Sequence, residues 1–538
     1  VALRTAMIDY NGRFCMSSAA TAAGRAFGLD RGLPFPVEDI AHTDLVLLAG
    51  ANVAETMPPI MRHFAALRTN GGRLIVVDPR RTLTAEQADL HLQPLPGTDL
   101  ALANGLLHLV IEQGYVDAEF VHARTSGFAG VRMSARAYWP ERVERLTGVP
   151  VSAMRTTVDW LGAARSVMVL TARGAEQHAT GTDTVLSFVN LALALGQAGR
   201  PFAGYGAITG QGNGQGGREH GQKADQLPGY RRIDDPAARR HVASVWGIDP
   251  SDLPGAGMPA YEMLSTLGSA GGVRNLLVFG SNPIVSSPNA RHVEERLASL
   301  DFLAVADVVL SETAATADVV LPVTQWAEET GTLTNLEGRV ILRNKAIDPP
   351  PGVRTDLEVL AALADRLGAT ASFPADPQVV FDELCRASAG GKSDYAGLSY
   401  SRIESEAGVF WPCPSAEHAG TPRLFLDAFA TPDGRARFHA VEYRGPAETP
   451  DDEYPLFLTT GRVLAQYQSG AQTRRIDALA DAAPEAFIEL HPSLAAHYGI
   501  AEGNRVRIHT RRGTALVIAR VTASIRDDTI FVPFHWGG

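Results

Sequence analysis

The sequence predicts an α/β protein with two related lobes, each built on a parallel sheet, and a smaller C-terminal β-barrel domain. Three observations predict this fold. Continuous apolar runs alternate with helical stretches, the same arrangement returns about 230 residues later, and short apolar runs split by Gly-bearing turns follow Tyr454.

The composition is that of a soluble globular chain of several domains. Its 538 residues are 45% hydrophobic and 20% charged, which predicts about three or four domains. No run approaches the roughly 18 apolar residues of a membrane helix. The net charge of -11 argues against a nucleic-acid-binding protein, because such proteins depend on basic residues for phosphate contacts.

The first lobe and its repeat are visible as matched motifs. An apolar run ends in Gly50 and Asn52, and a second such run ends in Gly280 and Asn282, an offset of 230 residues. The next apolar run ends in Asp78 in one copy and in Asp307 in the other, an offset of 229 residues. The pattern then continues in step through Thr84 and Thr313, and through Asp89 and Asp318.

Each copy has the pattern of a ligand-binding α/β unit. Continuous apolar runs between helices indicate buried parallel strands. A glycine at the carboxyl end of a strand allows a ligand to approach the backbone, and an acid after the next strand can accept hydrogen bonds from a ribose or a guanine edge. Two copies predict two nucleotide-like ligands, or one large ligand held between two lobes. The alternative is a repeat that serves packing alone.

Between the copies, residues 186–195 have the pattern of a buried helix, and a glycine-rich stretch follows at 204–217. Seven glycines in these fourteen residues cannot form a core element. We expect a loop that approaches a ligand closely rather than a flexible linker. Arg218 follows this loop, and its guanidinium could bind a small anion; the alternative is a surface salt bridge.

The rest of the chain divides into two further regions. Residues 373–445 are irregular and rich in Pro, Gly and Ser. From Tyr454 onward, short apolar runs and turns predict a small β-barrel or sandwich.

The N-terminal segment contains the sharpest local feature. Cys15 lies among small and polar residues, where a thiol can act as a metal ligand or a nucleophile; the alternative is a small buried residue. The sequence has no HExxH, Walker A or GxSxG motif. Its three cysteines, Cys15, Cys385 and Cys413, cannot supply the four thiolates of an ordinary iron–sulfur cluster or build a disulfide framework.

These motifs carry a resemblance to a known family. Residues 14–19 resemble the metal-ligand loop of molybdopterin-dependent oxidoreductases of the dimethyl sulfoxide reductase family. The Gly–Asn and Asp motifs of the two copies resemble that family's two dinucleotide-binding lobes. Residues 209–231, and residues 459–475 in the C-terminal region, resemble the bacterial assimilatory nitrate reductases of this family.

The resemblance implies a cofactor and a domain organisation. One molybdenum would be bound by two molybdopterin guanine dinucleotides, one to each lobe. We expect five parts: 1–14, the end of a preceding lobe and the entry to the metal-ligand loop; 15–225, the first lobe; 226–372, the second lobe; 373–445, a connecting region; and 446–538, an incomplete C-terminal molybdopterin-binding barrel.

The resemblance also implies individual roles. Cys15 would be the metal ligand, and Cys15, Met16, Gln211 and Arg218 would form the catalytic site. One cofactor would be held by Gly50, Asn52, Asp78, Thr82, Gly97, Asp99, Gly174 and Gln177. The other would be held by Gly280, Asn282, Asp307, Thr313 and Asp318. The pterin ends would meet Thr460, Gly461, Arg462, Thr473 and Arg474.

The expected reaction is the reduction of nitrate to nitrite by oxygen-atom transfer. Formate dehydrogenases of this family usually have a histidine after the metal ligand, whereas this chain has Met16, whose thioether cannot act as a base. The alternatives are a formate dehydrogenase or another oxidoreductase on the same scaffold, and a metal-free scaffold subunit of an electron-transfer complex. A plain guanine-nucleotide-binding module is a more distant alternative.

The chain also departs from the family pattern. It lacks the cysteine-rich [4Fe-4S] domain, so that cluster is expected in a full-length protein and not in this chain. Because the chain starts at Val1 and stops at Gly538 directly after an apolar segment, we expect both ends to be missing. The resemblance implies a cytoplasmic protein whose electron donor is ferredoxin, flavodoxin or an NADH-linked subunit. An assimilatory and a dissimilatory role both remain open.

Overall fold

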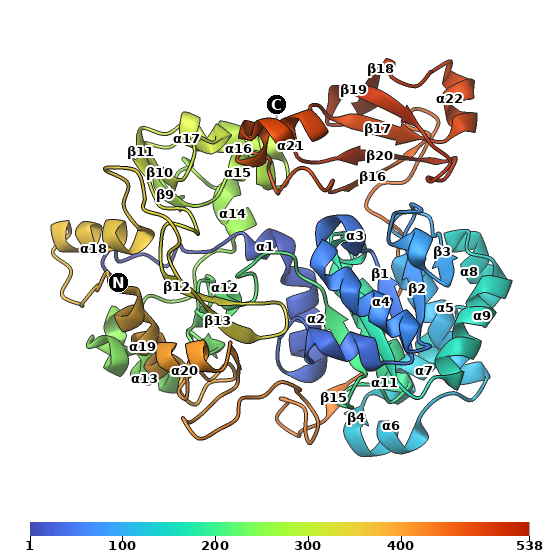
Figure 1. The fold of residues 1–538 in the computed structure, drawn as a ribbon, viewed down its shortest axis with the longest axis horizontal. Coiled ribbons are helices and arrows are strands. Elements are labelled where there is room, and N and C mark those ends of the chain that lie inside the picture. Colours follow the sequence, from blue (N-terminus) through green and yellow to red (C-terminus); the bar gives the residue numbers. More distant parts are fainter. Residues whose placement is uncertain (537–538) are drawn as a thin grey trace. The chain divides into compact units, whose positions relative to one another are not determined.

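The computed structural model describes residues 1–536, which form two compact units (Figure 1). The first unit comprises Val1–Cys15 and Gln211–Pro422, and the second comprises Met16–Gly210 and Arg423–Trp536. Both units are therefore discontinuous in sequence. Within residues 1–536, no helix has both the length and the apolar character needed to cross a membrane.

The second unit contains a five-stranded parallel sheet in the order β3-β2-β1-β5-β6. Its strands are β1 (Leu45–Ala49), β2 (Arg73–Val77), β3 (Leu90–Leu92), β5 (Val167–Thr171) and β6 (Gly204–Ala207). Every residue of β1 and β5 is buried. Continuous apolar runs are expected in such strands, because helices cover both faces of a parallel sheet.

Helices surround this sheet, and α11 (Gly181–Ala194) packs on α5 (Asp99–Glu112) and α2 (Ser17–Phe27). The buried helix predicted at 186–195 lies in α11, which begins five residues earlier. The other helices of this lobe are α3 (Val53–Thr56), α4 (Met61–Thr69), α6 (Ala118–Arg124), α7 (Phe128–Ala135), α8 (Pro140–Thr147), α9 (Val151–Ala163) and α10 (Arg173–Glu176). The short strands β4 (Thr125–Ser126) and β15 (Ala436–Arg437) pair with each other.

The C-terminal part of the second unit is a curled five-stranded sheet, a half-barrel, in the order β16-β20-β17-β19-β18. It consists of β16 (Phe457–Gly461), β17 (Phe487–Leu490), β18 (Arg505–Thr510), β19 (Gly513–Val521) and β20 (Thr529–Pro533), with α21 (Asp477–Ala482) and α22 (Pro492–Tyr498). Ile488, Leu490 and Ala519 are among the residues of its core. The short apolar runs that predicted a β domain form its strands.

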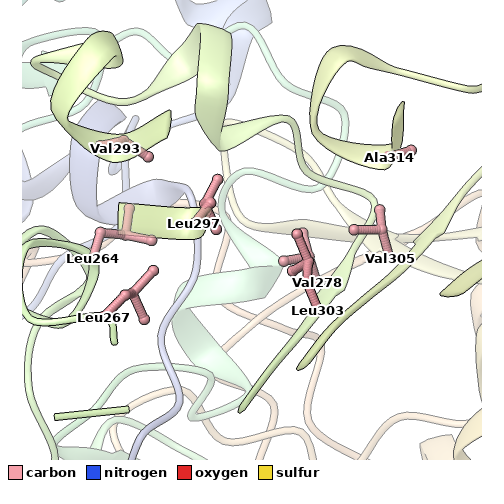
Figure 2. Packing of buried hydrophobic residues seen from close by; sticks show 8 residues of the cluster. All are labelled: Leu264, Leu267, Val278, Val293, Leu297, Leu303, Val305 and Ala314. Atoms are coloured by element: carbon pink, nitrogen blue, oxygen red, sulfur yellow. The ribbon is translucent and has the colours of Figure 1, made fainter. Parts of the chain in front are cut away.

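The first unit contains a three-stranded parallel sheet in the order β11-β10-β9. The strands are β9 (Asn275–Phe279), β10 (Phe302–Asp307) and β11 (Val319–Pro322), and the neighbouring helices are α14 (Ala260–Ser265), α15 (Pro283–Ser286), α16 (Ala290–Leu297) and α17 (Glu312–Ala315). Figure 2 shows the core of this lobe, in which Val278, Leu303 and Val305 of the strands lie with Leu264 and Leu297 of the helices.

The remainder of the first unit is mixed. An antiparallel sheet is formed by β12 (Gly331–Thr334), β13 (Arg339–Arg343) and β14 (Val409–Phe410), and a hairpin by β7 (Gln226–Leu227) and β8 (Arg231–Arg232). Its helices are α1 (Gly12–Cys15), α12 (Gly216–Glu219), α13 (Pro236–Trp246), α18 (Asp356–Arg366), α19 (Pro377–Ser388) and α20 (Tyr400–Ser405). The region expected to be irregular, 373–445, therefore holds α19 and α20.

The sequence repeat is a repeat of structure. Strands β1, β2 and β3 correspond to β9, β10 and β11, in the same order and all parallel. The amide of Gly50 donates to the Val77 carbonyl at 2.9 Å, and that of Gly280 donates to the Ala306 carbonyl at 2.9 Å. The sequence prediction of two related parallel-sheet lobes is confirmed.

Candidate active site and cofactor contacts

Cys15 and Gln211 are in direct contact within the first unit. Cys15 ends the short helix α1, and its thiol donates to the Gln211 side-chain oxygen, with 3.7 Å between Sγ and Oε1. The two residues are 196 positions apart in sequence. The fold therefore brings the predicted metal ligand and one of the predicted catalytic residues together.

A residue that sequence reasoning missed fixes the turn that carries Cys15. The Asp9 carboxylate accepts from the Arg13 Nε at 2.8 Å, from the Tyr10 amide at 3.0 Å and from the Ala260 amide at 2.8 Å. It thus binds the α1 segment to the start of α14. An acid at the start of a helical turn was the available signal.

The glycine-rich loop is held at specific points. The Asn213 side-chain oxygen accepts from the Thr334 amide at 2.9 Å, and the Asn213 carbonyl accepts from the Gly217 amide at 3.1 Å. A Cβ on Gly216 would lie 2.1 Å from the Asn213 Oδ1, so glycine is needed there for close packing. The loop is an ordered segment, which agrees with close approach and argues against a flexible linker.

Arg218 is completely buried, with 0% of its surface exposed, so it makes no surface salt bridge. Its Nη1 donates to the Gly214 carbonyl at 3.0 Å, and its Nη2 donates to the Gln215 side-chain oxygen. The glycine-rich loop therefore wraps around a guanidinium. Arg218 lies on α12, one helical turn after Gln215.

The neighbours of Arg218 form a buried polar group. The Tyr395 hydroxyl donates to the Glu219 carboxylate, and it also hydrogen-bonds the Thr334 hydroxyl at 2.7 Å. Burial raises the pKa of Tyr395 well above its usual value, and the nearby Glu219 charge raises it further. Burial also lowers the pKa of His220 to about 4, so this imidazole is neutral at pH 7.

Met16 begins the second unit and is 2% exposed. The Arg173 guanidinium contacts its sulfur and forms an ion pair with Glu176. Glu176 is 1% exposed and also accepts from the Thr171 hydroxyl at 2.6 Å. Arg173 and Glu176, which sequence reasoning missed, follow β5 directly and place a paired positive charge beside the residue that follows Cys15.

In the first lobe, Gly50 and Gly174 allow two βα turns to touch. The Gly174 amide donates to the Gly50 carbonyl at 2.9 Å, and a Cβ on Gly50 would lie 2.2 Å from the Ala175 amide nitrogen. The Asn52 side-chain oxygen accepts from the Thr84 hydroxyl at 2.9 Å. These residues thus shape the carboxyl edge of the sheet, and Gln177, which is exposed, follows α10 at the same edge.

Asp78 and Asp99 place two desolvated carboxyls in this lobe. Burial raises the pKa of Asp78 to about 6, against the opposing effects of the Arg80 amide and the Arg80 charge. Burial also raises the pKa of Asp99, which is the first residue of α5. The Thr82 hydroxyl accepts from the Ala85 amide at 3.2 Å, and Gly97, two residues before Asp99, has a φ of 81°.

The second lobe repeats this arrangement. The Asn282 side-chain oxygen accepts from the Thr313 hydroxyl at 2.8 Å, as Asn52 does from Thr84. The Asp307 carboxylate accepts from the Val308 amide and the Ser311 hydroxyl, both at 2.7 Å. Gly280 has a φ of 53° with nothing within 4 Å of a Cβ, so its surroundings are open, in contrast to those of Gly50.

Asp318 lies apart from this group. Its carboxylate accepts from the Leu303 amide at 2.7 Å, at the start of β10, whereas Asp307 ends the same strand. The fold therefore brings Gly280, Asn282, Asp307 and Thr313 to one edge of the sheet and Asp318 to the other.

Asp356 is a further carboxyl that sequence reasoning missed. It is the first residue of α18, and its pKa is raised to about 6 by burial and by the nearby charges of Glu329 and Asp307. The Thr355 capping box that starts α18 was visible in the sequence, but its proximity to Asp307 was not.

In the C-terminal half-barrel, the five predicted contacts lie at the end of β16 and in the loop that follows. Thr460 and Gly461 end this strand. The Arg462 Nη2 donates to the Gln468 side chain at 3.3 Å, the Thr473 hydroxyl donates to the Gln466 side chain at 2.7 Å, and the Arg474 Nη2 donates to the Ser469 carbonyl at 3.3 Å.

The side chains of this chain fit a metal ion whose ligands come mostly from a cofactor. Among residues 1–536, no three His, Cys, Asp or Glu side chains are grouped so as to hold a metal ion, and the thiol of Cys15 is a single soft donor. The desolvated carboxyls Asp78, Asp99 and Asp356 can accept hydrogen bonds from a guanine or a ribose, and the open turn at Gly280 leaves space for such a ligand.

Comparison with family models gives two matches. The model described as molybdopterin oxidoreductase matches residues 2–366. The model described as molybdopterin dinucleotide-binding domain matches residues 456–538.

Comparison with curated proteins finds nitrate reductases and formate dehydrogenases among the relatives. The chain is 46% identical over 539 residues to the assimilatory nitrate reductase catalytic subunit of Bacillus subtilis, an alignment that covers 100% of this chain and 76% of that protein. It is 36% identical to the F420-dependent formate dehydrogenase 1 subunit alpha of Methanococcus maripaludis, covering 99% and 78% of the two chains.

Among solved structures, the acetylene hydratase from Pelobacter acetylenicus superposes with a TM-score of 0.73. The match covers 97% of this chain and 74% of that one at 19% identity. At this identity the likeness establishes the fold alone.

Proposed function

Because the chain belongs to the molybdopterin oxidoreductase family, we propose that it is the catalytic part of a nitrate reductase. It would reduce nitrate to nitrite at a molybdenum centre held by two molybdopterin guanine dinucleotides. The observation that carries the proposal is the contact between Cys15 and Gln211 beside the loop that encloses Arg218, together with Met16 as the residue that follows Cys15.

The reaction consumes two electrons and two protons and converts nitrate to nitrite and water. When bound, the molybdenum cofactor supplies the two electrons and takes the oxygen atom that nitrate loses. The role we assign to the protein is to bind and orient the anion. Arg218 supplies a buried positive charge for a substrate and a product that are both monoanions, and such a charge acts strongly where water is excluded.

Cys15 is the residue proposed to bind the metal, as a thiolate. Its thiol donates to the Gln211 side-chain oxygen in this structure; a thiolate can only accept, so it would be bound by the N–H of the Gln211 amide instead. Met16 offers no proton acceptor at the next position. Within the second unit, Arg173 contacts the Met16 sulfur and is paired with Glu176.

We assign one dinucleotide to each sheet edge. Gly50, Asn52, Asp78, Thr82, Gly97, Asp99, Gly174 and Gln177 would hold the first. Gly280, Asn282, Asp307 and Thr313 would hold the second, and Asp356 is added to this set. Asp318 was also predicted to hold this dinucleotide, but its carboxylate accepts from the Leu303 amide at the other edge of the sheet. Thr460, Gly461, Arg462, Thr473 and Arg474 would meet the pterin ends.

Formate oxidation is the second candidate function, and the 36% identity to a formate dehydrogenase subunit favours it. Formate must lose a proton as well as two electrons, so a base beside the metal ligand helps this reaction. Met16 cannot act as that base, which is why we place nitrate first. A metal-free scaffold role would leave the Cys15 loop and the buried Arg218 without a purpose.

The test is an assay of the full-length gene product, purified without oxygen, with reduced viologen dye and nitrate. We expect nitrite from the wild type and at least a 1000-fold loss in Cys15→Ala. The matched control is Cys385→Ala, because Cys385 is a buried thiol whose pKa burial raises to about 12; this variant should keep its activity. Formate oxidation, assayed separately with oxidised viologen dye as the electron acceptor, would establish the second function if it replaced nitrate reduction. A folded protein without molybdenum and without either activity would refute both.

The electron donor and the remaining cofactors stay predictions. Ferredoxin, flavodoxin and an NADH-linked subunit are all compatible with the chain described here. A [4Fe-4S] cluster would need ligands beyond its three cysteines. The family resemblance predicts a cytoplasmic location.

A further inference from the structure

The His535 side chain is enclosed by a loop of the C-terminal half-barrel, the loop that carries the proposed pterin contacts. It follows β20, which is paired with β16 (Figure 1), and it is 0% exposed. The loop in question, 462–475, begins where β16 ends and contains Arg462, Thr473 and Arg474. No role at this position emerged from the sequence.

The imidazole bridges two points of this loop. Its Nε2 accepts from the Val463 amide at 3.0 Å, and its Nδ1 pairs with the Gln468 carbonyl at 2.7 Å. An amide can only donate and a carbonyl can only accept, so Nδ1 must carry the proton and Nε2 must be bare. This pair of hydrogen bonds fits the neutral imidazole in one tautomer.

The backbone of residues 534 and 535 also contacts this loop and the end of β16. A Cβ on Gly470 would lie 2.6 Å from the His535 carbonyl oxygen, and Gly470 has a φ of 73°, so glycine is needed at this approach. The Phe534 amide donates to the Gly461 carbonyl at 3.2 Å. The loop therefore packs directly against the segment after β20.

The charged surroundings favour the same protonation state. Burial lowers the pKa of His535; the Gln468 carbonyl opposes this effect, and the positive charges of Arg462 and Arg474 add to it. These arginines are the charged groups that act on the ring among the described residues. A protonated ring would direct an N–H at the Val463 N–H and lose that hydrogen bond.

We propose that His535 is a positioning residue that holds the 462–475 loop in the shape that binds the molybdopterin cofactor, and that it does so as the neutral Nδ1–H tautomer. The proposal rests on the cofactor binding proposed above. It assigns His535 no contact with nitrate and no part in the chemistry.

The test compares His535→Phe, which fills the space without hydrogen bonds, with His535→Gln, whose amide offers one acceptor and one donor and does not titrate. The full-length protein is purified at pH 7.5, and molybdenum per chain is measured. We expect at least threefold less molybdenum in His535→Phe and a value within twofold of the wild type in His535→Gln. His497→Gln, an exposed histidine of the same half-barrel, is the matched control.

Limited trypsin digestion gives a readout that does not require activity. Trypsin can cut after Arg462, Arg474 and Arg475. We expect these cuts at least tenfold faster in cofactor-free His535→Phe than in cofactor-free wild type or His535→Gln. Equal molybdenum and equal cutting in His535→Phe and the wild type would overturn the proposal, and so would a His535→Gln variant as impaired as His535→Phe.

The pH dependence decides the question if His535→Phe does not fold. When the pH is lowered stepwise from 7.5, molybdenum should be released faster from the wild type than from His535→Gln, because only the wild type has an imidazole that can be protonated at this position. Equal release would overturn the proposal. A wild type that holds molybdenum and does not reduce nitrate would refute the proposed function while leaving this inference intact.

Discussion

Asp78 follows β2 and Asp89 precedes the neighbouring strand β3, and their different partners separate a carboxyl that is available to a ligand from one that supports the fold. Asp89 lies at the amino edge of the sheet and accepts from the Leu74 amide at 2.8 Å. Asp78 lies at the carboxyl edge and accepts from the Arg80 amide at 2.8 Å, while burial raises its pKa to about 6. The Asp78 carboxyl is therefore costly to ionise unless a ligand donates a hydrogen bond to it.

We therefore predict that Asp78→Asn stabilises the cofactor-free protein above pH 6. A raised carboxyl pKa means that the native wild type holds a proton that the unfolded chain releases, so its stability falls as the pH rises from about 4 to 6. At pH 8 the variant should be more stable by about 2 kcal/mol, since solvent partly screens this half-buried group. At pH 4 the two proteins should be alike.

Urea unfolding of the cofactor-free protein at pH 4 and pH 8 measures this difference. Asp89→Asn is the control, and it should be less stable than the wild type at pH 8 because it weakens a hydrogen bond to a charged group. In a separate measurement on protein purified with its cofactor, Asp78→Asn should retain less molybdenum than the wild type. A variant no more stable than the wild type at pH 8 would contradict the prediction.

The sequence predicted part of this residue-level division. The matched offsets placed Asp89 with Asp318 correctly, because these carboxylates accept from the corresponding Leu74 and Leu303 amides. They also placed Asp78 with Asp307 at the ends of the corresponding strands, although Asp78 accepts from the Arg80 amide and Asp307 from the Val308 amide and the Ser311 hydroxyl. It could not show that each pair lies at a different sheet edge, since spacing along the chain does not fix where a loop returns. Arg173 and Asp356 were missed for the same reason: their partners Met16 and Asp307 are distant in sequence.

At the scale of elements, the two lobes share their βα turns and differ in what surrounds them. Gly50 is pressed against Gly174 and Ala175 of the turn after β5, whereas Gly280 has open space around it. The reason is the sheet: the first lobe adds β5 and β6 next to β1, and the second sheet ends at β9. The repeated sequence motif therefore predicted the turn but not its neighbours.

This difference predicts unequal effects of the same substitution. Gly50→Ala would place a Cβ 2.2 Å from the Ala175 nitrogen at a φ of 68°, and we expect a loss of about 4 kcal/mol or failure to fold. Gly280→Ala, at a φ of 53° with no clash, should lose about 1 kcal/mol.

Urea unfolding of the cofactor-free variants compares them, with Gly71→Ala as a control for positive φ alone, because nothing lies within 4 Å of its Cβ. Similar losses in Gly50→Ala and Gly280→Ala would contradict the difference between the turns. Molybdenum content adds a second comparison. A stable Gly280→Ala protein that retains less molybdenum would support a ligand at this turn.

At the scale of the whole molecule, the least predictable feature is that both compact units are discontinuous. Periodicity predicts strands and helices only in their order along the chain. The second unit instead joins Met16–Gly210 to Arg423–Trp536. Such joining depends on contacts between residues hundreds of positions apart, which one sequence does not reveal.

Arg80 makes one of these contacts. Its Nε and Nη2 donate to the Glu489 carboxylate at 2.9 Å and 2.8 Å, and its guanidinium lies 3.5 Å from the centre of the Phe531 ring. Both side chains of the ion pair are mostly buried, at 15% and 14% exposed. This geometry connects the turn after β2 to β17 and β20 of the half-barrel.

We predict that Arg80→Met and Glu489→Gln each destabilise this junction by about 3 kcal/mol, because each leaves the partner charge buried and unpaired. The double variant should lose less than the sum of the two, since it removes both charges. Amide hydrogen exchange in β17 and β20 measures the local free energy of opening. It avoids the assumption that a protein of several domains unfolds in one step.

The control is the exposed ion pair of Arg274 and Asp301, whose side chains are 61% and 51% exposed. Substituting either residue should change the free energy of opening measured by exchange by less than about 0.5 kcal/mol. If the single variants at Arg80 and Glu489 left exchange in β17 and β20 unchanged, the ion pair would not be what couples the half-barrel to the lobe. Faster exchange there, with the β1 and β5 amides unaffected, would mean that the half-barrel opens as a separate cooperative element. In that case the loop proposed to bind the pterin ends would reach the cofactor only while this junction is closed.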